Sequence, residues 1–151
     1  MELTVLAQRL MDHLGALPEV KACQLYGSLS TGTWDVYSDI DVEANVSGTD
    51  NSVFLTRLPD LVSPVFPVVF FDYAPSLAPD KYVITLALDE TNPFRMADIA
   101  CTATPHCPTL GRQELSALNH SQDHLMKLLS ANLKHTLRGA DCQRDIAKMY
   151  A

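Results

Sequence analysis

The chain has 151 residues, of which 47% are hydrophobic, and carries a formal net charge of −7. This length and apolar content suffice for one ordinary domain, alone or with a helical appendage, and exclude a largely disordered chain. Acidic residues dominate residues 1–100, whereas residues 101–151 hold four acidic and six basic residues. Because affinity for long nucleic acids rests on neutralised phosphates, the acidic balance argues against such a partner.

The first half of the chain predicts alternating helices and strands. Leucines at 3, 6, 10 and 14 predict a helix over residues 3–14, stopped by Gly15 and Pro18. Further elements are expected in the order strand 20–26, short helix 28–34, strand 40–46, helix 53–62 broken at Pro59, and strand 65–73. Pro67 places the last of these at an edge of the sheet or near the start of the strand.

The second half predicts two more strands and a helical end. Strands are expected at 82–88 and 94–102, and a linker at 103–111. A long helix then covers residues 114–137 and ends at Gly139, and Asp141 caps a last helix that runs to the end of the chain. The order predicts an α/β sandwich with a mixed sheet. We expect a first domain over residues 1–104, followed by a linker and C-terminal helical segment over residues 105–151.

The cellular setting is indicated by what the chain lacks. No stretch is apolar for long enough to cross a bilayer, and the start lacks the basic region of a signal peptide. The four cysteines do not form a Cys-x-x-Cys pair. These features predict a cytoplasmic protein with reduced thiols and no membrane partner.

The most informative stretch is residues 27–42. Gly27 and Ser28 follow an apolar run, and Asp39-Ile40-Asp41 comes ten residues later. On a strand, side chains alternate between faces, so Asp39 and Asp41 point the same way. Paired carboxylates suit Mg²⁺ or Mn²⁺, and a Gly-Ser turn at the start of a helix is a natural seat for a phosphate. Together they predict chemistry on a nucleotide.

The pattern resembles the nucleotidyltransferase superfamily that includes DNA polymerase beta. The match runs through Tyr26-Gly27-Ser28 and Asp39-Ile40-Asp41-Val42, within a similarity that spans roughly residues 20–102. The longer form, Gly-Ser-x4-Gly-x5-Ser-Asp-x-Asp, is similar to the antibiotic adenylyltransferase and minimal nucleotidyltransferase branches. These often carry Arg where this chain has Thr31. The resemblance implies a nucleotidyltransferase fold of the α+β type, a Mg²⁺ or Mn²⁺ ion, and a nucleoside triphosphate, with ATP the expected donor.

The resemblance also implies a third carboxylate on a later strand, and two positions compete. Asp98 lies in the middle of an apolar strand, where a charged residue is rare without a partner or a metal. Asp72 lies at a strand end before a Pro-rich loop, where capping of the loop is a sufficient explanation. Asp98 is the preferred ligand, and would also accept or orient the proton of the acceptor hydroxyl.

Other residues are candidates for the nucleotide site. Ser28 would bond a β- or γ-phosphate oxygen, Thr31 would line the phosphate pocket, and Ser38 would orient Asp39. Arg95, close to Asp98 in sequence, would contact the triphosphate. One or two of the basic residues of the C-terminal helices would also reach the phosphates, unless they form a solvated face: Lys127, Lys134, Arg138, Arg144 and Lys148.

These observations predict an enzyme that transfers a nucleoside monophosphate, AMP in the expected case, to a hydroxyl of a small molecule such as an aminoglycoside or a lincosamide. The resemblance leaves two alternatives open. One is a minimal nucleotidyltransferase of a toxin–antitoxin pair that binds or nucleotidylates a helical partner protein, and the other is a degenerate nucleotide-binding module. A homodimer is expected through an apolar stripe of the long helix formed by Leu115, Leu118, Leu125 and Leu129.

Overall fold

A five-stranded mixed sheet is the centre of the computed structural model, which describes residues 2–74 and 78–149, with the backbone alone for residues 142–149. The strand order is β1-β2-β5-β4-β3, in which β2 and β5 are parallel and the other neighbours are antiparallel. The strands are β1 (Ala22–Tyr26), β2 (Ile40–Asn45), β3 (Phe70–Ala74), β4 (Lys81–Ala87) and β5 (Met96–Thr102). The predicted mixed α+β fold is therefore confirmed.

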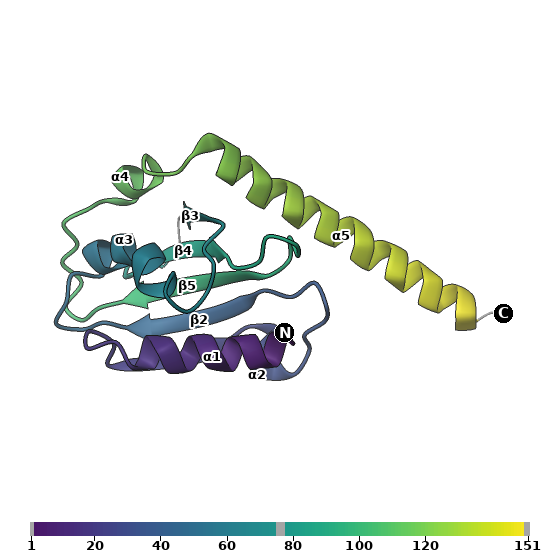
Figure 1. Cartoon of the computed structure of the whole chain (residues 1–151), viewed down its shortest axis with the longest axis horizontal. Helices are drawn as coiled ribbons and strands as arrows, with labels where there is room; N and C mark the ends of the chain where they lie inside the picture. Colours follow the sequence, from purple (N-terminus) through teal and green to yellow (C-terminus); the bar gives the residue numbers. More distant parts are fainter. Residues whose placement is uncertain (1, 75–77, 150–151) are drawn as a thin grey trace.

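Two helices, α1 (Leu3–Gly15) and α3 (Asn51–Val62), cover one face of the sheet (Figure 1). The alternation of β2 shows why, since Ile40, Val42 and Ala44 are fully buried against these helices and the residues between them are half-buried. Leu10 and Leu14 of α1 and Phe54 and Leu58 of α3 complete this core. The opposite face of the sheet is thereby free to carry polar side chains.

Three further helices complete the described chain. The single turn α2 (Ser28–Thr31) follows β1, and α4 (Arg112–Ser116) leads to the long α5 (Ser121–Met149). In Figure 1, α5 begins beside the β3 edge and extends beyond the sheet toward the C-terminal end of the chain. No described helix is long and apolar enough to span a membrane.

The expected break of the second long helix is wrong. Helix α3 runs without interruption through Pro59, which lies inside it. Proline removes one backbone hydrogen bond and costs about 3 kcal/mol in a helix interior. Burial of Leu55, Leu58 and Val62 at 0% exposure on the same helix offsets that cost.

The third strand begins later than predicted, at Phe70 rather than residue 65. It lies at an edge of the sheet, as Pro67 indicated. The backbone N–H of Val69 already donates to the carbonyl of Ala87, just before the regular ladder starts. A proline two residues upstream has no N–H with which to extend that ladder further.

The predicted division of the C-terminal helices is also wrong. The chain leaves the helix at residues 117–120, and α5 then continues through Gly139 and Asp141. Asn119 explains the interruption, because its side-chain amide bonds to both the N–H and the carbonyl of Tyr73 and so extends the β3 edge. Leu115 lies in the core at 3% exposure, so it does not belong to an exposed stripe with Leu118 and Leu125.

Candidate active site

The turn between β1 and α2 brings the backbone close to Asp41. Gly27 has φ 69° and ψ −150°, in the left-handed half of the map that favours glycine. A Cβ atom at Gly27 would stand 2.5 Å from Oδ2 of Asp41. Only glycine therefore allows the Gly-Ser turn to approach the second carboxylate of the motif this closely.

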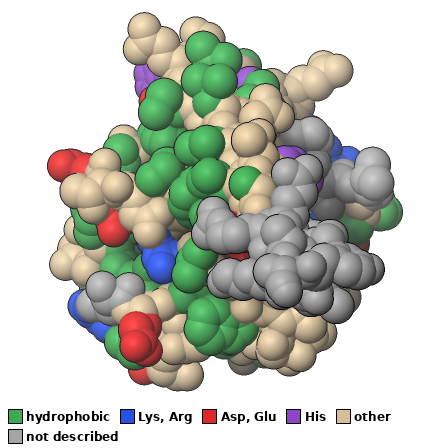
Figure 2. Space-filling model, turned by 90° about the vertical axis from the view of Figure 1, so that its right-hand side faces the viewer, with side chains coloured by type: hydrophobic (Ala, Val, Ile, Leu, Met, Phe, Trp, Pro, Cys, Tyr) green, Lys and Arg blue, Asp and Glu red, His purple; other side chains and the backbone are tan. Residues whose placement is uncertain are grey.

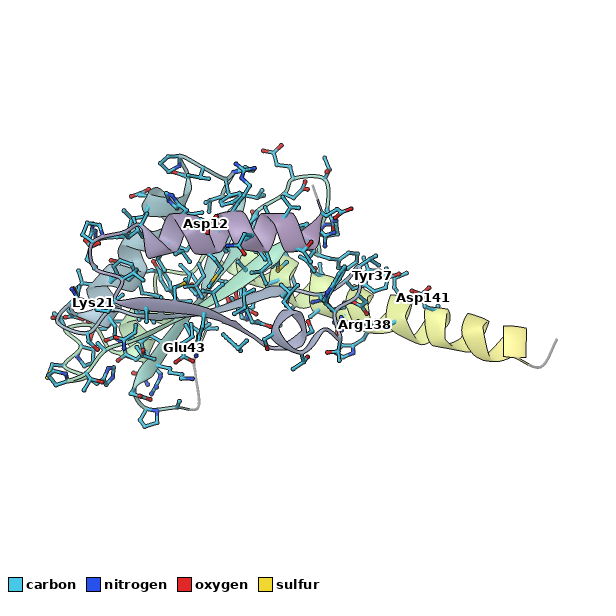
Figure 3. The ribbon with its side chains drawn as sticks, turned by 90° about the horizontal axis from the view of Figure 1, so that it is seen from below. Asp12, Lys21, Tyr37, Glu43, Arg138 and Asp141 are labelled. Carbon is cyan, nitrogen blue, oxygen red and sulfur yellow. The ribbon has the colours of Figure 1, made fainter. Side chains whose placement is uncertain are left out.

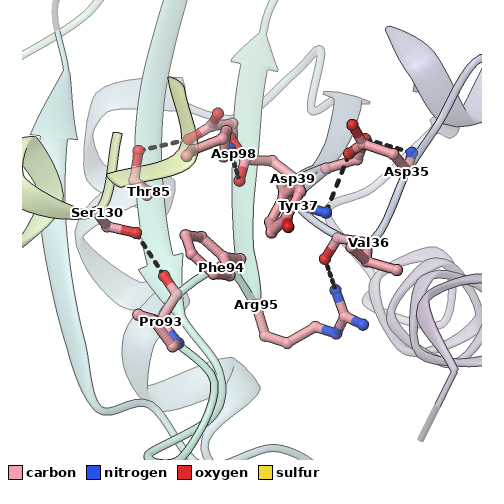
Figure 4. A network of polar contacts seen from close by, with 12 residues as sticks. Asp35, Val36, Tyr37, Asp39, Thr85, Pro93, Phe94, Arg95, Asp98 and Ser130 are labelled. Carbon is pink, nitrogen blue, oxygen red and sulfur yellow. Dashed lines mark hydrogen bonds and ion pairs between the residues drawn. The ribbon is translucent and has the colours of Figure 1, made fainter. Parts of the chain in front are cut away.

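A single row of polar side chains crosses the sheet from β2 to β3. Asp41 pairs in register with Asp98, Asp98 with Thr85, and Thr85 with Asp72. Residues that pair in register point to the same face, so these side chains all lie opposite α1 and α3. The Thr85 hydroxyl donates to Asp98 Oδ1 at 2.5 Å and holds that carboxylate in place (Figure 4).

The electrostatics of this row are unfavourable for a free carboxylate. Burial and the neighbouring carboxylates of Asp98 and Asp39 raise the pKa of Asp41 to about 7. Burial, reinforced by Asp41 and Asp98, raises the pKa of the Tyr26 phenol to about 12. Burial is the main cause of both shifts and the neighbouring carboxylates add to them, so a cation at this position would offset the added negative charge.

Asp39 lies just before β2 and has a cation of its own. The Lys134 ammonium of α5 lies 2.8 Å from Asp39 Oδ1, and the two side chains are only 15% and 27% exposed. Burial nevertheless raises the pKa of Asp39 against the opposing effect of Lys134. Lys134 was expected among the residues that reach phosphates, and the structure places it on a carboxylate of the motif.

The fit of a divalent cation is therefore partial in this conformation. Among the residues that the structure describes, no three His, Cys, Asp or Glu side chains are grouped closely enough to hold a metal ion. Asp41 and Asp98 are adjacent across the parallel β2–β5 pair, and both offer the hard oxygen donors that Mg²⁺ prefers. Asp39 offers the same chemistry but is paired with Lys134. The metal assignment remains a prediction.

The loop before β2 is tied to α5 by a second ionic contact. Arg138 donates to Asp35 through two nitrogens, at 2.8 and 2.7 Å, and this pairing lowers the pKa of Asp35 to about 2. The Tyr37 hydroxyl donates to Asp141, and Figure 3 shows Tyr37, Arg138 and Asp141 together where the loop meets α5. Ser38 is buried and bonds to Asp35, so it shapes this loop rather than touching Asp39.

Two predicted nucleotide-binding residues point elsewhere. The exposed Thr31 hydroxyl contacts the Gly27 and Ser28 carbonyls and the Thr33 hydroxyl, within its own turn. Arg95 donates to the carbonyl of Val36 at 3.2 Å, away from Asp98 (Figure 4). Strand alternation explains this, because residues 95 and 98 are three positions apart and therefore face opposite sides of the sheet. Ser28 stays at the start of α2, beside Gly27.

Asp72 lies in the same row as Asp98 but is otherwise engaged. It is 1% exposed and is held by His124 Nδ1 at 3.0 Å and by the Lys127 ammonium at 3.1 Å, both from α5. Asp98, by contrast, is the direct register partner of Asp41. The geometry favours Asp98 over Asp72 as the third carboxylate, and Asp72 has a structural role in docking α5.

Sequence reasoning missed the partners that organise these carboxylates. Thr85 had a weak signal, because it is a polar residue inside a run of apolar strand residues. No sequence pattern indicated the pairing of Asp35 with Arg138 or of Asp72 with His124, because each joins residues more than fifty positions apart.

Comparison with known proteins adds little to this geometry. No protein-family model matches the chain, and no curated protein matches it. Among solved structures, the Cid1 poly(U) polymerase matches with 17% sequence identity and a TM-score of 0.43. The match covers 65% of this chain and 28% of the polymerase chain. Similarity at this level leaves the activity of the chain open, so its function has to be inferred from the geometry of the site.

Proposed function

We propose that the chain is a metal-dependent nucleotidyltransferase that moves a nucleoside monophosphate from a nucleoside triphosphate to a hydroxyl group. One observation carries the proposal: Asp41 and Asp98 are register partners on the parallel strands β2 and β5, directly beside the Gly27 turn. The raised pKa values of Asp41 and Asp39 support it, because carboxylates that are buried close to one another are stabilised by a bound cation. ATP is the proposed donor, on the resemblance of the motif.

In this proposal Asp39, Asp41 and Asp98 would hold Mg²⁺ or Mn²⁺, which when bound would supply positive charge for the triphosphate. The Gly27–Ser28 turn lies beside the phosphates. The acceptor oxygen bonds to the α-phosphorus, the bond to the β-phosphate oxygen breaks, and pyrophosphate leaves. Asp98 takes the proton of the acceptor hydroxyl, and Thr85 keeps its carboxylate oriented toward the site.

The direct test measures transfer of label from each α-labelled nucleoside triphosphate, with Mg²⁺, to a panel of hydroxyl-bearing molecules that includes aminoglycosides and lincosamides. We expect label in an acceptor and release of pyrophosphate.

Asp41→Asn and Asp98→Asn should each lower turnover at least 100-fold, which corresponds to about 2.7 kcal/mol in the barrier. Asp60→Asn, on the exposed surface of α3, is the control and should keep full activity. Full activity in both site variants would refute the assignment.

A second candidate acceptor is a helical protein, as in a toxin–antitoxin pair. The observation that favours it is an exposed apolar surface on α5 (Leu125, Met126, Leu128, Leu129 and Leu133), each 45–55% exposed. Figure 2 shows hydrophobic side chains gathered on the side of the molecule toward which α5 runs. A second copy of the chain would use the same surface. Sedimentation at micromolar concentration separates the cases, because a homodimer has twice the 16.6 kDa mass of the chain.

A further inference from the structure

A small cavity lies beside the row of carboxylates, across the sheet from the Gly27 turn and over β3, β4 and the start of β5. It measures about 120 Å³ and lies between the sheet and α5. Its floor is one register row, Phe70, Ala87 and Met96, and its α5 wall is Met126 and Ser130. Met96 precedes Asp98 by two residues on β5, so the two side chains share a face and lie about 7 Å apart along the strand.

A hydrogen bond and two ion pairs hold α5 over the cavity. Ser130 is 7% exposed and donates to the carbonyl of Pro93 at 2.7 Å, which fixes α5 against the loop between β4 and β5 (Figure 4). On either side of Ser130, the α5 residues Lys127 and Lys134 are ion-paired with Asp72 and Asp39. Helix α5 therefore lies over this face of the sheet from β3 toward β2, and the cavity lies between the helix and the sheet.

The chemistry of the walls selects a type of ligand. The lining is mainly apolar, and an apolar cavity of about 150 Å³ is known to hold one benzene molecule. At the rim stand Asp89 and Glu90, and hydrogen bonds from Thr91 lower the pKa of Asp89, which keeps it ionised at neutral pH. A compact ring or short alkyl group fits the interior, and the rim attracts a cation and repels an anion.

We infer that this cavity is the acceptor subsite, and that the acceptor is a small cationic amine with one hydroxyl and one compact apolar group. The inference rests on the proposed function. The two halves of the reaction then lie on opposite sides of Asp98: the triphosphate toward the Gly27 turn and β1, and the apolar group of the acceptor over β4 and β3.

Three probes separate the features of this ligand. The compound 2-amino-1-phenylethanol carries the ring, the amine and the hydroxyl. Mandelate has a carboxylate in place of the aminomethyl group, and ethanolamine lacks the ring. Binding is followed on the methionine methyl groups by NMR, without nucleotide or metal. We expect 2-amino-1-phenylethanol to shift the methyl signals of Met96 and Met126 but not that of Met11, which is on α1. Mandelate and ethanolamine should bind at least 10-fold more weakly.

Two variants on α5 form a matched pair. Met126→Trp places a larger side chain at the cavity wall and should abolish the shift of the Met96 methyl, whereas Leu133→Trp, outside the cavity, should leave it unchanged. Glu90→Lys leaves Asp89 as the one carboxylate beside a new ammonium, so it should abolish the preference for the amine over mandelate. Equal binding of the two aromatic probes to the unmodified protein, or full binding to Met126→Trp, would overturn the inference. Calorimetric titration with ATP and Mg²⁺ reports on the proposed function separately, so failure of one proposal leaves the other measurable.

Discussion

At the scale of single residues, the site depends on how closely the backbone approaches Asp41. The turn before α2 needs both a left-handed φ at Gly27 and the absence of a Cβ, because the space is taken by Asp41 Oδ2. Gly32, which ends α2, has a similar φ of 75° but no heavy atom within 4 Å of the place where its Cβ would stand. A side chain at Gly32 would therefore meet backbone strain alone, whereas one at Gly27 would meet the same strain and the contact with the carboxylate.

Gly27→Ala should cost more free energy of unfolding than Gly32→Ala. Both variants incur about 1–2 kcal/mol for a side chain in the left-handed region. Only Gly27→Ala adds the 2.5 Å contact with Asp41, which must move to relieve it. Urea denaturation measures the two costs, and titration with ATP and Mg²⁺ should show binding lost in Gly27→Ala alone. Equal costs and equal binding would mean that the close approach to Asp41 has no role.

Asp41→Asn should stabilise the protein in a way that depends on pH. A carboxyl whose pKa rises on folding, here to about 7, stabilises the folded state at low pH, and that contribution is lost as pH rises from about 4 to 7. The asparagine amide of the variant does not ionise, so the variant does not lose this stability as the pH rises. It is therefore more stable than the parent above pH 7. Allowing for screening by solvent, we expect about 1 kcal/mol, or about 2–4 °C in Tm, at pH 8 and little gain at pH 4.

Scans of both proteins at the two pH values without divalent cations measure the effect. Asp60→Asn serves as the control for removal of one surface charge. A gain that is equal at both pH values would contradict the raised pKa, and a loss at pH 8 would mean that the Asp41 carboxylate is stabilised by groups of the fold.

At the scale of elements, α5 shows how a glycine can be misinterpreted. Gly139 has the position of a helix-ending residue in the sequence, but the structure continues the helix through it. Its φ is not positive, and no neighbouring heavy atom lies within 4 Å of its missing Cβ. The contacts of Arg138 with Asp35 and of Asp141 with Tyr37 lie on either side of Gly139 and keep this turn helical.

Gly139→Ala therefore tests the continuity of α5. If the helix is continuous, alanine should raise the free energy of unfolding by about 0.5–1 kcal/mol, because glycine in a helix interior is less favourable than alanine. If Gly139 ended a helix in the left-handed conformation, the same change would destabilise the protein. Denaturation of the two proteins under one set of conditions distinguishes the signs.

At the scale of the whole molecule, the site is assembled from a strongly acidic sheet and a basic helix. The first hundred residues carry most of the acidic side chains, and α5 returns cations to them at Asp72, Asp39 and Asp35. The same helix contributes Met126 and Ser130 to the cavity. The position of α5 therefore couples three properties: access of a cation to Asp39, the shape of the cavity and the exposure of the apolar surface.

Lys134→Ala should make the protein bind a divalent cation more tightly in the absence of nucleotide. The ammonium competes with a metal ion for Asp39. Its removal also takes away a positive charge, so the remaining carboxylates attract a cation more strongly. We expect affinity for Mn²⁺ to rise about 3–10-fold, as measured by electron paramagnetic resonance of the free ion. Lys21→Ala, an exposed change at the far end of β1, is the control for net charge. Weaker binding of Mn²⁺ to Lys134→Ala would contradict this competition.

The sequence by itself indicated the candidate carboxylates and the main elements that carry them. The alternation of Asp39, Ile40 and Asp41 predicts two carboxylates on one side of a strand, and the structure places Asp41 in β2 and Asp39 just before it. Helical spacing likewise predicted α1, apolar and β-branched content predicted the five strands, and the order of the elements predicted the mixed sheet. Asp98 was a candidate because it is a charged residue inside an otherwise apolar strand.

Tertiary structure alone decided the partners of those residues and the limits of several elements. Burial of one helix face kept α3 intact through Pro59, and a side-chain amide that bonds to β3 ended α4 before Leu118. Lys134 reached Asp39 across ninety-five positions, which no local pattern can reveal. Short-range patterns depend on neighbours a few residues away, whereas ion pairs and cavities depend on segments that meet only when the chain is folded.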